Sequence, residues 1–380
     1  MTRPKIMIVY GTRPEAIKVA PLIKALASDD RFECVVASTG QHREMLDQVH
    51  EMFGITPDVE LAIMRAGQTL NDIVSRVIAA LDEVFEREQP HAVVVHGDTS
   101  TAMAAAIAAF NRGSKIIHLE AGLRTSTLHS PFPEEANRRV ISRLASLHLA
   151  PTSRAKQHLL AENTPPASIV VTGNTVIDAL IEATSWDTRF SDAGLEALAH
   201  DDRRVILVTT HRRENLMAMA AIGRAMKSLA HRYPDDVLVL PAHLNPKVRA
   251  AVLPEIDDVN NIIVTDPLPY DEFTKLMARS TLILTDSGGI QEEAPALGKP
   301  VLVMRESTER PEAIEAGTVR LVGLSEDNIT QAAIELLDDS SVYAEMANAV
   351  NPFGDGTAVA ASISAIARLL LASSPDSPTP

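Results

Sequence analysis

Short runs of aliphatic and β-branched residues alternate along the chain with longer stretches in which apolar positions recur at helical spacing. In the first half, the short runs predict buried strands at KIMIVY, ECVVAST, AVVVHGD, KIIHLEAG and LHLAPT. Helices are predicted between them at 17–27, from about 42, at 70–88, at 100–111 and at PEEANRRVISRLA, while GTRPEAIKVAP is expected to be a loop. Strands separated by helices of this length indicate βαβ units and a parallel sheet.

The same alternation restarts near Gly173, after which further strands are predicted beyond a looser stretch at 185–203. We therefore expect an α/β protein with two doubly wound Rossmann-like domains facing a central cleft, at residues 1–172 and 173–357. A last helix at 358–371 is expected to pack back on the first domain. Residues 372–380 have the composition of a disordered tail.

Nearly all polar motifs directly follow a predicted strand. They are GTRPE, STGQH, HGDTS, EAGLR, THRRE, DPLPY, DSGG and MRESTER. Because ligands of doubly wound sheets bind at the carboxyl ends of the strands, motifs from both halves are expected to line one cleft.

Length and charge narrow the range of functions. The 380 residues suffice for two full cores, and the net charge of −15 argues against a partner such as duplex nucleic acid. Cys34 is the single cysteine, so no disulfide framework is expected. No apolar run approaches the roughly 18–20 residues that span a bilayer, and the N-terminal run is too short for a signal peptide. We expect a cytoplasmic protein without a membrane partner.

The stretch TLILTDSGGIQEEAPALGKP combines a strand at 281–285, a turn with two glycines and a predicted helix at 290–297. Glycines at Gly288 and Gly289 let backbone N–H groups approach a ligand, and a helix N-terminus favours an anion. This pattern predicts a phosphate site with Ser287 in the turn and Glu293 placed to bind a ribose diol. The alternative is a plain strand–turn–helix in which Ser287 caps the helix.

The first polar motif, GTRPEAIK, lacks the G-x-G-x-x-G pattern of NAD-binding sites, because only Gly11 is a glycine. Arg13 and Lys18 instead supply cations that suit a pyrophosphate. The alternative is that both are solvated charges at the start of a helix.

Three carboxylates are candidates for acid–base chemistry. Asp98 precedes the Ala-rich helix, where it could equally be an N-cap. Glu120 ends an apolar strand, where a carboxylate is costly unless it is paired or functional, and Arg124 is a candidate partner. Glu134 lies in a first helical turn, where the helix dipole and an i,i+4 pair with Arg138 would also explain it.

Two cationic motifs belong to the second half. His211 is flanked by Arg212 and Arg213, which suits a phosphate that receives a proton. Arg310 could bind a phosphate bidentately, or form a surface salt bridge with a neighbouring glutamate. The sequence contains no HExxH, CxxC or calcium loop, so no catalytic metal is expected.

Nine motifs with preserved spacing carry a resemblance that covers residues from about 5 to 365. They are GTRPEAIKVAP, TGQHREML, VHGDTSTAMA, HLEAGLRT, SPFPEEANRR, VTGNTVIDAL, HRREN, DSGGIQEEAPALGKPVLVMR and TERPEAIEAGTVRLVG. The chain resembles the non-hydrolysing UDP-N-acetylglucosamine 2-epimerase family. The resemblance implies a glycosyltransferase-B-like fold, a homodimer, and interconversion of UDP-GlcNAc and UDP-ManNAc with no cofactor, supplying ManNAc for bacterial cell-surface polysaccharide.

The resemblance also implies which residues contact the UDP-sugar. These are Arg13, Lys18, Asp98, Glu120, His211, Leu268, Phe273, Ser287, Gly288, Gly289, Glu293 and Arg310. Asp98, Glu120 and Glu134 match the family's acid–base carboxylates, and His211 matches its helper at the leaving phosphate. Leu268 stands where some relatives have Gln, so its contact is expected through the backbone. Gln41 and His42 match a second, activating substrate site of some relatives.

The chemistry of such an enzyme explains the residue types. The C2 hydrogen becomes acidic only as the anomeric C–O bond breaks, so UDP leaves from C1 and loss of the C2 proton gives a 2-acetamidoglucal. A proton then adds to the opposite face of C2 and UDP adds back to C1. Clustered carboxylates are expected to raise one another's pKa, which would keep one of them protonated. The alternatives are a UDP-sugar glycosyltransferase of the same fold, a hydrolysing relative, and a non-catalytic nucleotide-sugar sensor.

Overall fold

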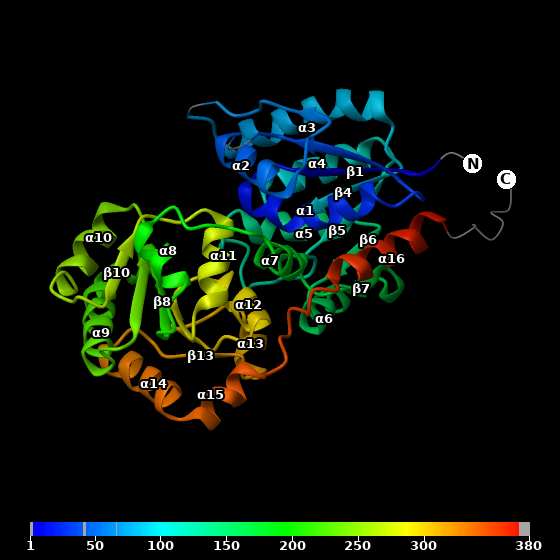
Figure 1. Ribbon diagram of the computed structural model, residues 1–380. Helices are drawn as coiled ribbons and strands as arrows, with labels where there is room; N and C mark the ends of the chain where they lie inside the picture. The colour runs from blue at the N-terminus through cyan, green and yellow to red at the C-terminus, as the bar shows by residue number, and fades with distance from the viewer. Residues whose placement is uncertain (1–2, 41–42, 66, 372–380) are drawn as a thin grey trace, which may run out of the picture. The chain divides into compact units, whose positions relative to one another are not determined.

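The computed structural model describes residues 3–40, 43–65 and 67–371 (Figure 1). Gln41, His42 and the tail predicted at 372–380 lie outside the described residues. The described chain forms two compact units. The first unit holds the residues up to Ala179 and those from Phe353 on, and the second holds Leu180–Pro352. The limits expected from the sequence were residues 173 and 358.

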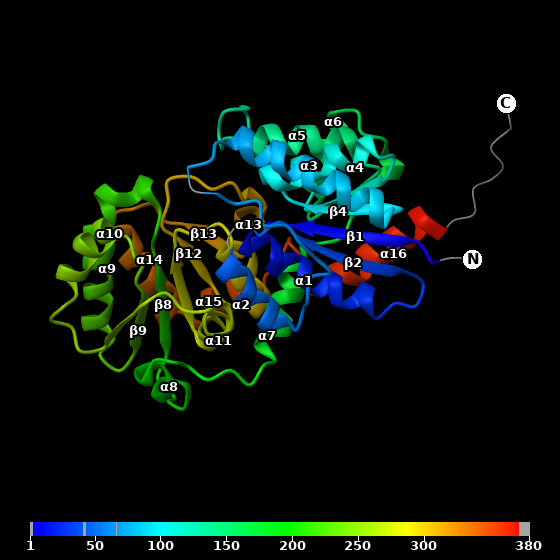
Figure 2. The same cartoon turned by 90° about the horizontal axis from the view of Figure 1, so that it is seen from above.

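The first unit contains a seven-stranded parallel sheet in the order β3-β2-β1-β4-β5-β6-β7. The strands are β1 (Lys5–Tyr10), β2 (Glu33–Ser38), β3 (Val59–Glu60), β4 (Ala92–His96), β5 (Lys115–Leu119), β6 (Leu147–Ala150) and β7 (Ile169–Val171). The helices are α1 (Arg13–Ala27), α2 (Arg43–Phe53), α3 (Leu70–Glu88), α4 (Ser100–Asn111), α5 (Glu134–Leu144), α6 (Ser153–Ala161), α7 (Thr175–Thr184), which runs past the unit's limit, and α16 (Ala358–Leu371). Helices α3, α4 and α5 cover one face, and α1 and α16 cover the other (Figure 2).

The second unit contains a six-stranded parallel sheet in the order β10-β9-β8-β11-β12-β13. The strands are β8 (Val205–Thr209), β9 (Val237–Pro241), β10 (Ile262–Thr265), β11 (Leu282–Thr285), β12 (Val301–Val303) and β13 (Val319–Leu321). The helices are α8 (Ala193–Ala199), α9 (Met219–Arg232), α10 (Pro246–Val252), α11 (Tyr270–Arg279), α12 (Ile290–Glu293), α13 (Pro311–Glu315), α14 (Glu326–Asp338) and α15 (Ser340–Ala347). Together the two sheets confirm the predicted α/β class and doubly wound order.

The central strands are buried on both faces, which is why they appear in the sequence as continuous apolar runs. Every residue of β4 is buried, and so are the alanines of α4 that face its neighbours. Their small side chains let α4 pack closely between α3 and α5. Within the described residues, no helix is long and apolar enough to cross a membrane.

Two helices differ from their predicted bounds. Helix α1 begins at Arg13 because Thr12 and Glu15 form a capping box, so GTRPE is a helix start and not a loop, and Pro21 lies inside the helix. The helix predicted at 290–297 has only Ile290–Glu293 in α-conformation, followed by a 3₁₀ turn at Ala294–Leu297. Pro295 has no N–H with which to continue the α-helical hydrogen bonds.

Two buried histidines predict how stability depends on pH. His118 and His148 face each other across β5 and β6, and burial lowers their pKa to about 3 and about 4. The unfolded chain protonates them near pH 6.5, so the stability that the neutral rings provide is complete above that pH and is lost as the pH falls toward 4 and 3. Between pH 6.5 and 4, each histidine should lower the unfolding free energy by about 1.4 kcal/mol for every unit by which the pH falls.

Chemical denaturation at a series of pH values measures this slope. His118→Gln, which can still donate to the carbonyl of Gly97 that His118 Nε2 contacts at 2.8 Å, should flatten it. His200→Gln is the matched control, because the side chain of His200 is 79% exposed. Equal slopes in the His118 variant and the wild type would contradict this account.

Candidate functional site

The predicted site residues that the structure describes lie at strand ends or in the helices that follow. In the first unit, Arg13 and Lys18 belong to α1, Asp98 and Glu120 follow β4 and β5, and Glu134 is the first residue of α5. In the second unit, His211 follows β8, Leu268 and Phe273 follow β10, Ser287, Gly288, Gly289 and Glu293 follow β11, and Arg310 directly precedes α13.

Glu120 contacts side chains from three separate segments. Its Oε2 accepts hydrogen bonds from Lys18 Nζ and, at 3.0 Å, from Asn174 Nδ2, and His96 Nε2 lies 3.3 Å from the same oxygen. Burial by itself raises the pKa of Glu120, but the Lys18 charge and the contact with His96 outweigh it and hold the pKa well below its usual range. Glu120 therefore stays ionised, so it is not the carboxylate that the cluster was expected to keep protonated.

The candidate partner Arg124 does not pair with Glu120. Arg124 instead forms a bidentate ion pair with Glu162, with Nε and Nη2 at 2.8 and 2.9 Å from the two carboxylate oxygens. The backbone of Glu120 has a φ of +60°, which turns the chain away from the strand direction at the end of β5. Its side chain thereby reaches Lys18 in place of the arginine four residues on.

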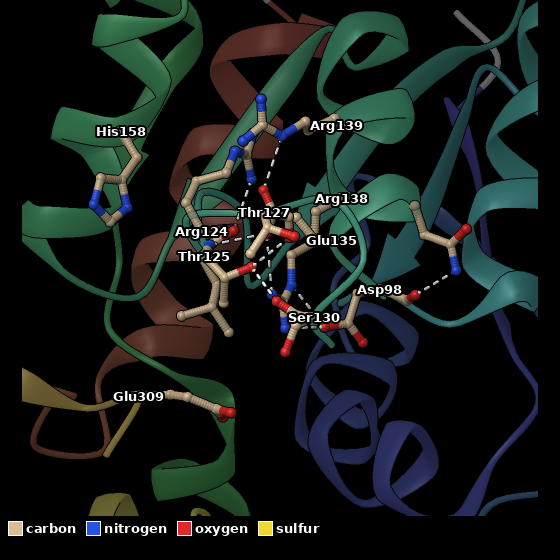
Figure 3. Close-up of polar contacts among 12 residues, drawn as sticks. Asp98, Arg124, Thr125, Thr127, Ser130, Glu135, Arg138, Arg139, His158 and Glu309 are labelled. Carbon is tan, nitrogen blue, oxygen red and sulfur yellow. Dashed lines mark hydrogen bonds and ion pairs between the residues drawn. The ribbon is translucent and has the colours of Figure 1, made fainter. Parts of the chain in front are cut away.

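Asp98 is an ion-pair partner and not the N-cap of α4. Thr99 caps the helix by accepting a hydrogen bond from Ala102 N at 3.0 Å. Oδ2 of Asp98 accepts a hydrogen bond from Arg138 Nε at 2.8 Å, and Arg138 Nη2 lies 2.7 Å from the same oxygen (Figure 3). The predicted pair between Glu134 and Arg138 is therefore wrong. Among the described residues, Oε2 of Glu134 is buried and has no hydrogen-bond partner.

Glu15 is a buried residue that the sequence-based candidates missed. Its carboxylate accepts from Gly11 N at 3.1 Å, from Thr12 N and Oγ1 at 2.9 and 2.8 Å, and from Thr99 Oγ1 at 2.8 Å. Burial raises the pKa of Glu15. The carboxylate ties the turn after β1 to the turn after β4. Gly11 is also required for space, because a Cβ there would lie 2.3 Å from Thr39 Oγ1, in the turn after β2.

Asp286 organises the polar loop of the second unit. It is fully buried, and its carboxylate accepts from Thr210 Oγ1 at 3.0 Å, from the backbone N of His211 and Arg212 at 3.1 and 3.0 Å, and from Asn215 Nδ2 at 3.2 Å. His211 Nδ1 lies 3.0 Å from it. Burial raises the pKa of Asp286, but these hydrogen bonds outweigh it and the pKa is lowered. The sequence showed Asp286 only as a turn residue.

A cavity of about 280 Å³ opens beside this loop. It is lined by Thr209, Thr210, His211, Pro241, His243, Pro267, Leu268, Phe273, Ser287, Ile290 and Glu293. Five of the predicted site residues therefore meet at one cavity. His243, which was not predicted, stacks on His211 with ring centroids 6.1 Å apart. The motif LPAH could have indicated His243, because it places another polar residue after a strand.

Arg310 lies directly over the glycine turn. Its Nε donates to Glu292 at 2.8 Å and its Nη1 to Glu309 at 3.0 Å. A Cβ on Gly288 would lie 3.1 Å from Nη1 of Arg310, so an alanine there would shift the guanidinium by a few tenths of an ångström. Gly289 has an ordinary φ of −64°, and no side chain caps α12, so the alternative in which Ser287 caps the helix is wrong.

Within the described part of the chain, no group of three or more histidine, cysteine, aspartate or glutamate side chains is arranged to hold a metal ion. The side chains at the candidate positions are carboxylates, cations and an imidazole. The ionised carboxylate of Glu120 lies at the carboxyl ends of the strands in the first unit, and a cavity bordered by His211 and Glu293 opens at the carboxyl ends of the strands in the second.

Two parallel sheets with polar residues at the strand ends are typical of a class of two-domain α/β proteins that includes glycosyltransferases. A solved glycosyltransferase from Rickettsia africae shares the fold, with a TM-score of 0.65 at 14% identity, covering 98% of this chain and all of that one. The sequence matches the family model described as UDP-N-acetylglucosamine 2-epimerase over residues 24–367. The chain belongs to the UDP-N-acetylglucosamine 2-epimerase family, which confirms the resemblance and the predicted enzyme class, an isomerase.

Individual relatives are similar over nearly their full length. The UDP-N-acetylglucosamine 2-epimerase of Escherichia coli (strain K12) is 49% identical over 360 residues, which is 93% of this chain and 96% of the relative. The crystal structure of UDP-GlcNAc 2-epimerase from Neisseria meningitidis bound to UDP-GlcNAc is 45% identical, with a TM-score of 0.84, and covers 96% of this chain and all of that one.

The role of Asp286 is testable by Asp286→Asn. The amide would place an NH₂ group against backbone N–H donors, so we expect the unfolding free energy to fall by about 1–3 kcal/mol. Chemical denaturation measures the change. Asp266→Asn is the control, because that side chain is 79% exposed and pairs with Arg249 at the surface. Equal stability of the two variants would refute this role.

Proposed function

We propose that this chain interconverts UDP-N-acetylglucosamine and UDP-N-acetylmannosamine by eliminating UDP to a 2-acetamidoglucal and adding it back. The observation that carries the proposal is the ionised Glu120 held by Lys18 and His96, beside Asp98 held by Arg138, in a chain of this family. The relative from Neisseria meningitidis binds UDP-GlcNAc, which supports the same ligand for this chain.

We assign recognition of UDP to the second unit. Its cavity offers Leu268 and Phe273 to the uracil side and Glu293 to the ribose diol. The turn at 287–289 and the Arg310 guanidinium supply backbone donors and a forked cation for the diphosphate. His211 borders the same cavity and is the candidate to assist the leaving phosphate.

We assign the proton transfers to the carboxylates of the first unit. A carboxylate with a low pKa is a weak base, but a weak base suffices once the C1–O bond is breaking, because positive charge at C1 acidifies the C2 hydrogen. Epimerisation removes the proton from one face of the sugar and returns it to the other, so two groups are needed. Glu120 is the candidate acceptor for one face, and Asp98 and Glu134 remain for the opposite face.

The cations of α1 have different tasks in this proposal. Lys18 contacts Glu120, so its first effect is to keep that carboxylate ionised, and its contact with the diphosphate stays a prediction. Arg13 remains the candidate cation for the diphosphate. No NAD is involved, because the G-x-G-x-x-G fingerprint is missing after β1. A homodimer, a cytoplasmic location and a supply of ManNAc for polysaccharide synthesis are proposals that rest on the family resemblance.

Purified protein with UDP-GlcNAc in D₂O, without NAD or an acceptor, tests the function. NMR should show UDP-ManNAc carrying deuterium at C2. Asp98→Asn is the control, and its turnover should fall by about 10²-fold or more, the usual scale for lost acid–base help. A glycosyltransferase would leave the substrate unchanged, a hydrolysing enzyme would release free ManNAc, and a sensor would bind without turnover. Any of these three results would contradict the proposed function.

The glycine turn predicts how tightly UDP is retained after the C1–O bond breaks. Gly288→Ala must displace the Arg310 guanidinium, whereas a Cβ on Gly289 finds only Glu293 Oε2, at an ordinary 3.5 Å. We expect Gly288→Ala to raise free UDP release relative to epimer formed, by more than Gly289→Ala does. Chromatographic separation of UDP from the two UDP-sugars measures this ratio. Equal leakage from both variants would exclude displacement of Arg310 as the cause.

A further inference from the structure

Two side chains at the start of α5 form a buried ion pair directly behind Asp98 (Figure 3). Glu135 has no exposed surface, and the side chain of Arg138 is only 8% exposed. Arg138 Nη1 lies 3.2 Å from Glu135 Oε2. Neither residue was among the sequence-based site candidates. Breaking such a pair by removing one partner leaves an uncompensated charge, so both residues constrain what surrounds them.

Arg138 holds Asp98 through one oxygen only. Its Nε and Nη2 both reach Oδ2, at 2.8 and 2.7 Å, and the Asp98 side chain is 27% exposed. Among the described residues, Oδ1 of Asp98 has no hydrogen-bond partner. Asn137 Nδ2 donates to the backbone carbonyl of Asp98 at 2.8 Å, so α5 holds both the main chain and the side chain of this residue.

Glu135 in turn fixes the orientation of Arg138. A guanidinium is planar, so holding Nη1 on Glu135 sets the direction in which Nε and Nη2 point. Glu135 also accepts from the backbone N of Thr125 at 3.0 Å and from Arg139 Nε at 2.9 Å. Thr125 Oγ1 donates to Ser130 O at 2.7 Å, so the segment between β5 and α5 is tied to the same carboxylate (Figure 3).

We propose that Glu135 and Arg138 are positioning residues, which fix the Asp98 carboxylate so that Oδ1 is the one oxygen left for proton transfer with the sugar. The inference rests on the proposed epimerase function. It assigns a task to the PEEANRR motif other than the one expected from the sequence. Glu134 was the expected contributor there, whereas the residues that contact Asp98 lie three and four positions further on.

Arg139 supplies a matched control. It is the neighbouring arginine on the same helix and pairs with the same Glu135, at 2.9 Å, but its side chain is 44% exposed and it does not contact Asp98. A role limited to balancing the charge of Glu135 would affect both arginines alike. A role in positioning Asp98 would affect Arg138 alone.

The experiment compares Arg138→Met, Arg138→Lys, Glu135→Gln and Arg139→Met. Readouts are kcat for UDP-ManNAc formation, the Kd for UDP by calorimetry, and the melting temperature. We expect Arg138→Met to lose about 10²-fold in kcat, the scale for a catalytic group displaced by about 1 Å, and Arg139→Met to stay within about twofold of the wild type. Arg138→Lys and Glu135→Gln should each lose about tenfold. The Kd for UDP should change by less than about twofold throughout, because the residues assigned to UDP belong to the second unit.

Added guanidinium ion should restore part of the kcat of Arg138→Met, as a structural defect would not allow. Equal kcat values for Arg138→Met and Arg139→Met would overturn the inference, provided that the wild type converts UDP-GlcNAc. Should Arg138→Met fail to fold, the comparison of Arg138→Lys with Arg139→Met decides in the same way.

A wild type that does not convert UDP-GlcNAc would contradict the proposed function, and the inference would then be decided by structure. Crystal structures of Arg138→Lys and Arg139→Met, without substrate, show the orientation of Asp98. More than one orientation of the carboxylate in Arg138→Lys alone supports positioning by Arg138. An unchanged orientation in Arg138→Lys overturns it.

Discussion

Carboxylates buried at the carboxyl ends of the strands are the constraint on which both units depend. An ionised carboxylate removed from water costs several kcal/mol unless donors surround it. In the first unit, Glu15 and Glu120 recruit donors from three turns and from α1, and in the second unit Asp286 recruits the loop after β8. Each carboxylate therefore determines the conformation of the segments that carry the candidate site.

The cation that contacts each carboxylate differs between the candidate acid–base residues. Glu120 meets the ammonium of Lys18, while Asp98 meets the planar guanidinium of Arg138, which occupies one of its oxygens. In the second unit, Asp286 holds the main chain beside His211, so the imidazole is placed at the cavity before a ligand arrives. Groups fixed in this way need little reorganisation during a reaction, which is the main source of electrostatic stabilisation in active sites.

Three helices could be predicted to the residue. α3, α4 and α16 have the predicted bounds 70–88, 100–111 and 358–371, and Thr69 and Thr99 cap the first two. Two other helix predictions were wrong where local chemistry outweighed periodicity: Thr12 and Glu15 start α1 early, and Pro295 ends the α-helical turn of α12. Five predicted site residues line one cavity, because polar residues after parallel strands share an edge of the sheet.

The sequence by itself determined the order of strands and helices, the placement of polar motifs at strand ends, and the family. Only the tertiary structure decided which charges pair. Glu120 pairs with Lys18, 102 residues away, and not with the nearby Arg124. Arg138 pairs with Asp98, 40 residues away, and not with Glu134. Periodicity describes neighbours three or four residues apart, whereas a buried charge pairs with whichever donor the packed sheet brings within hydrogen-bond distance.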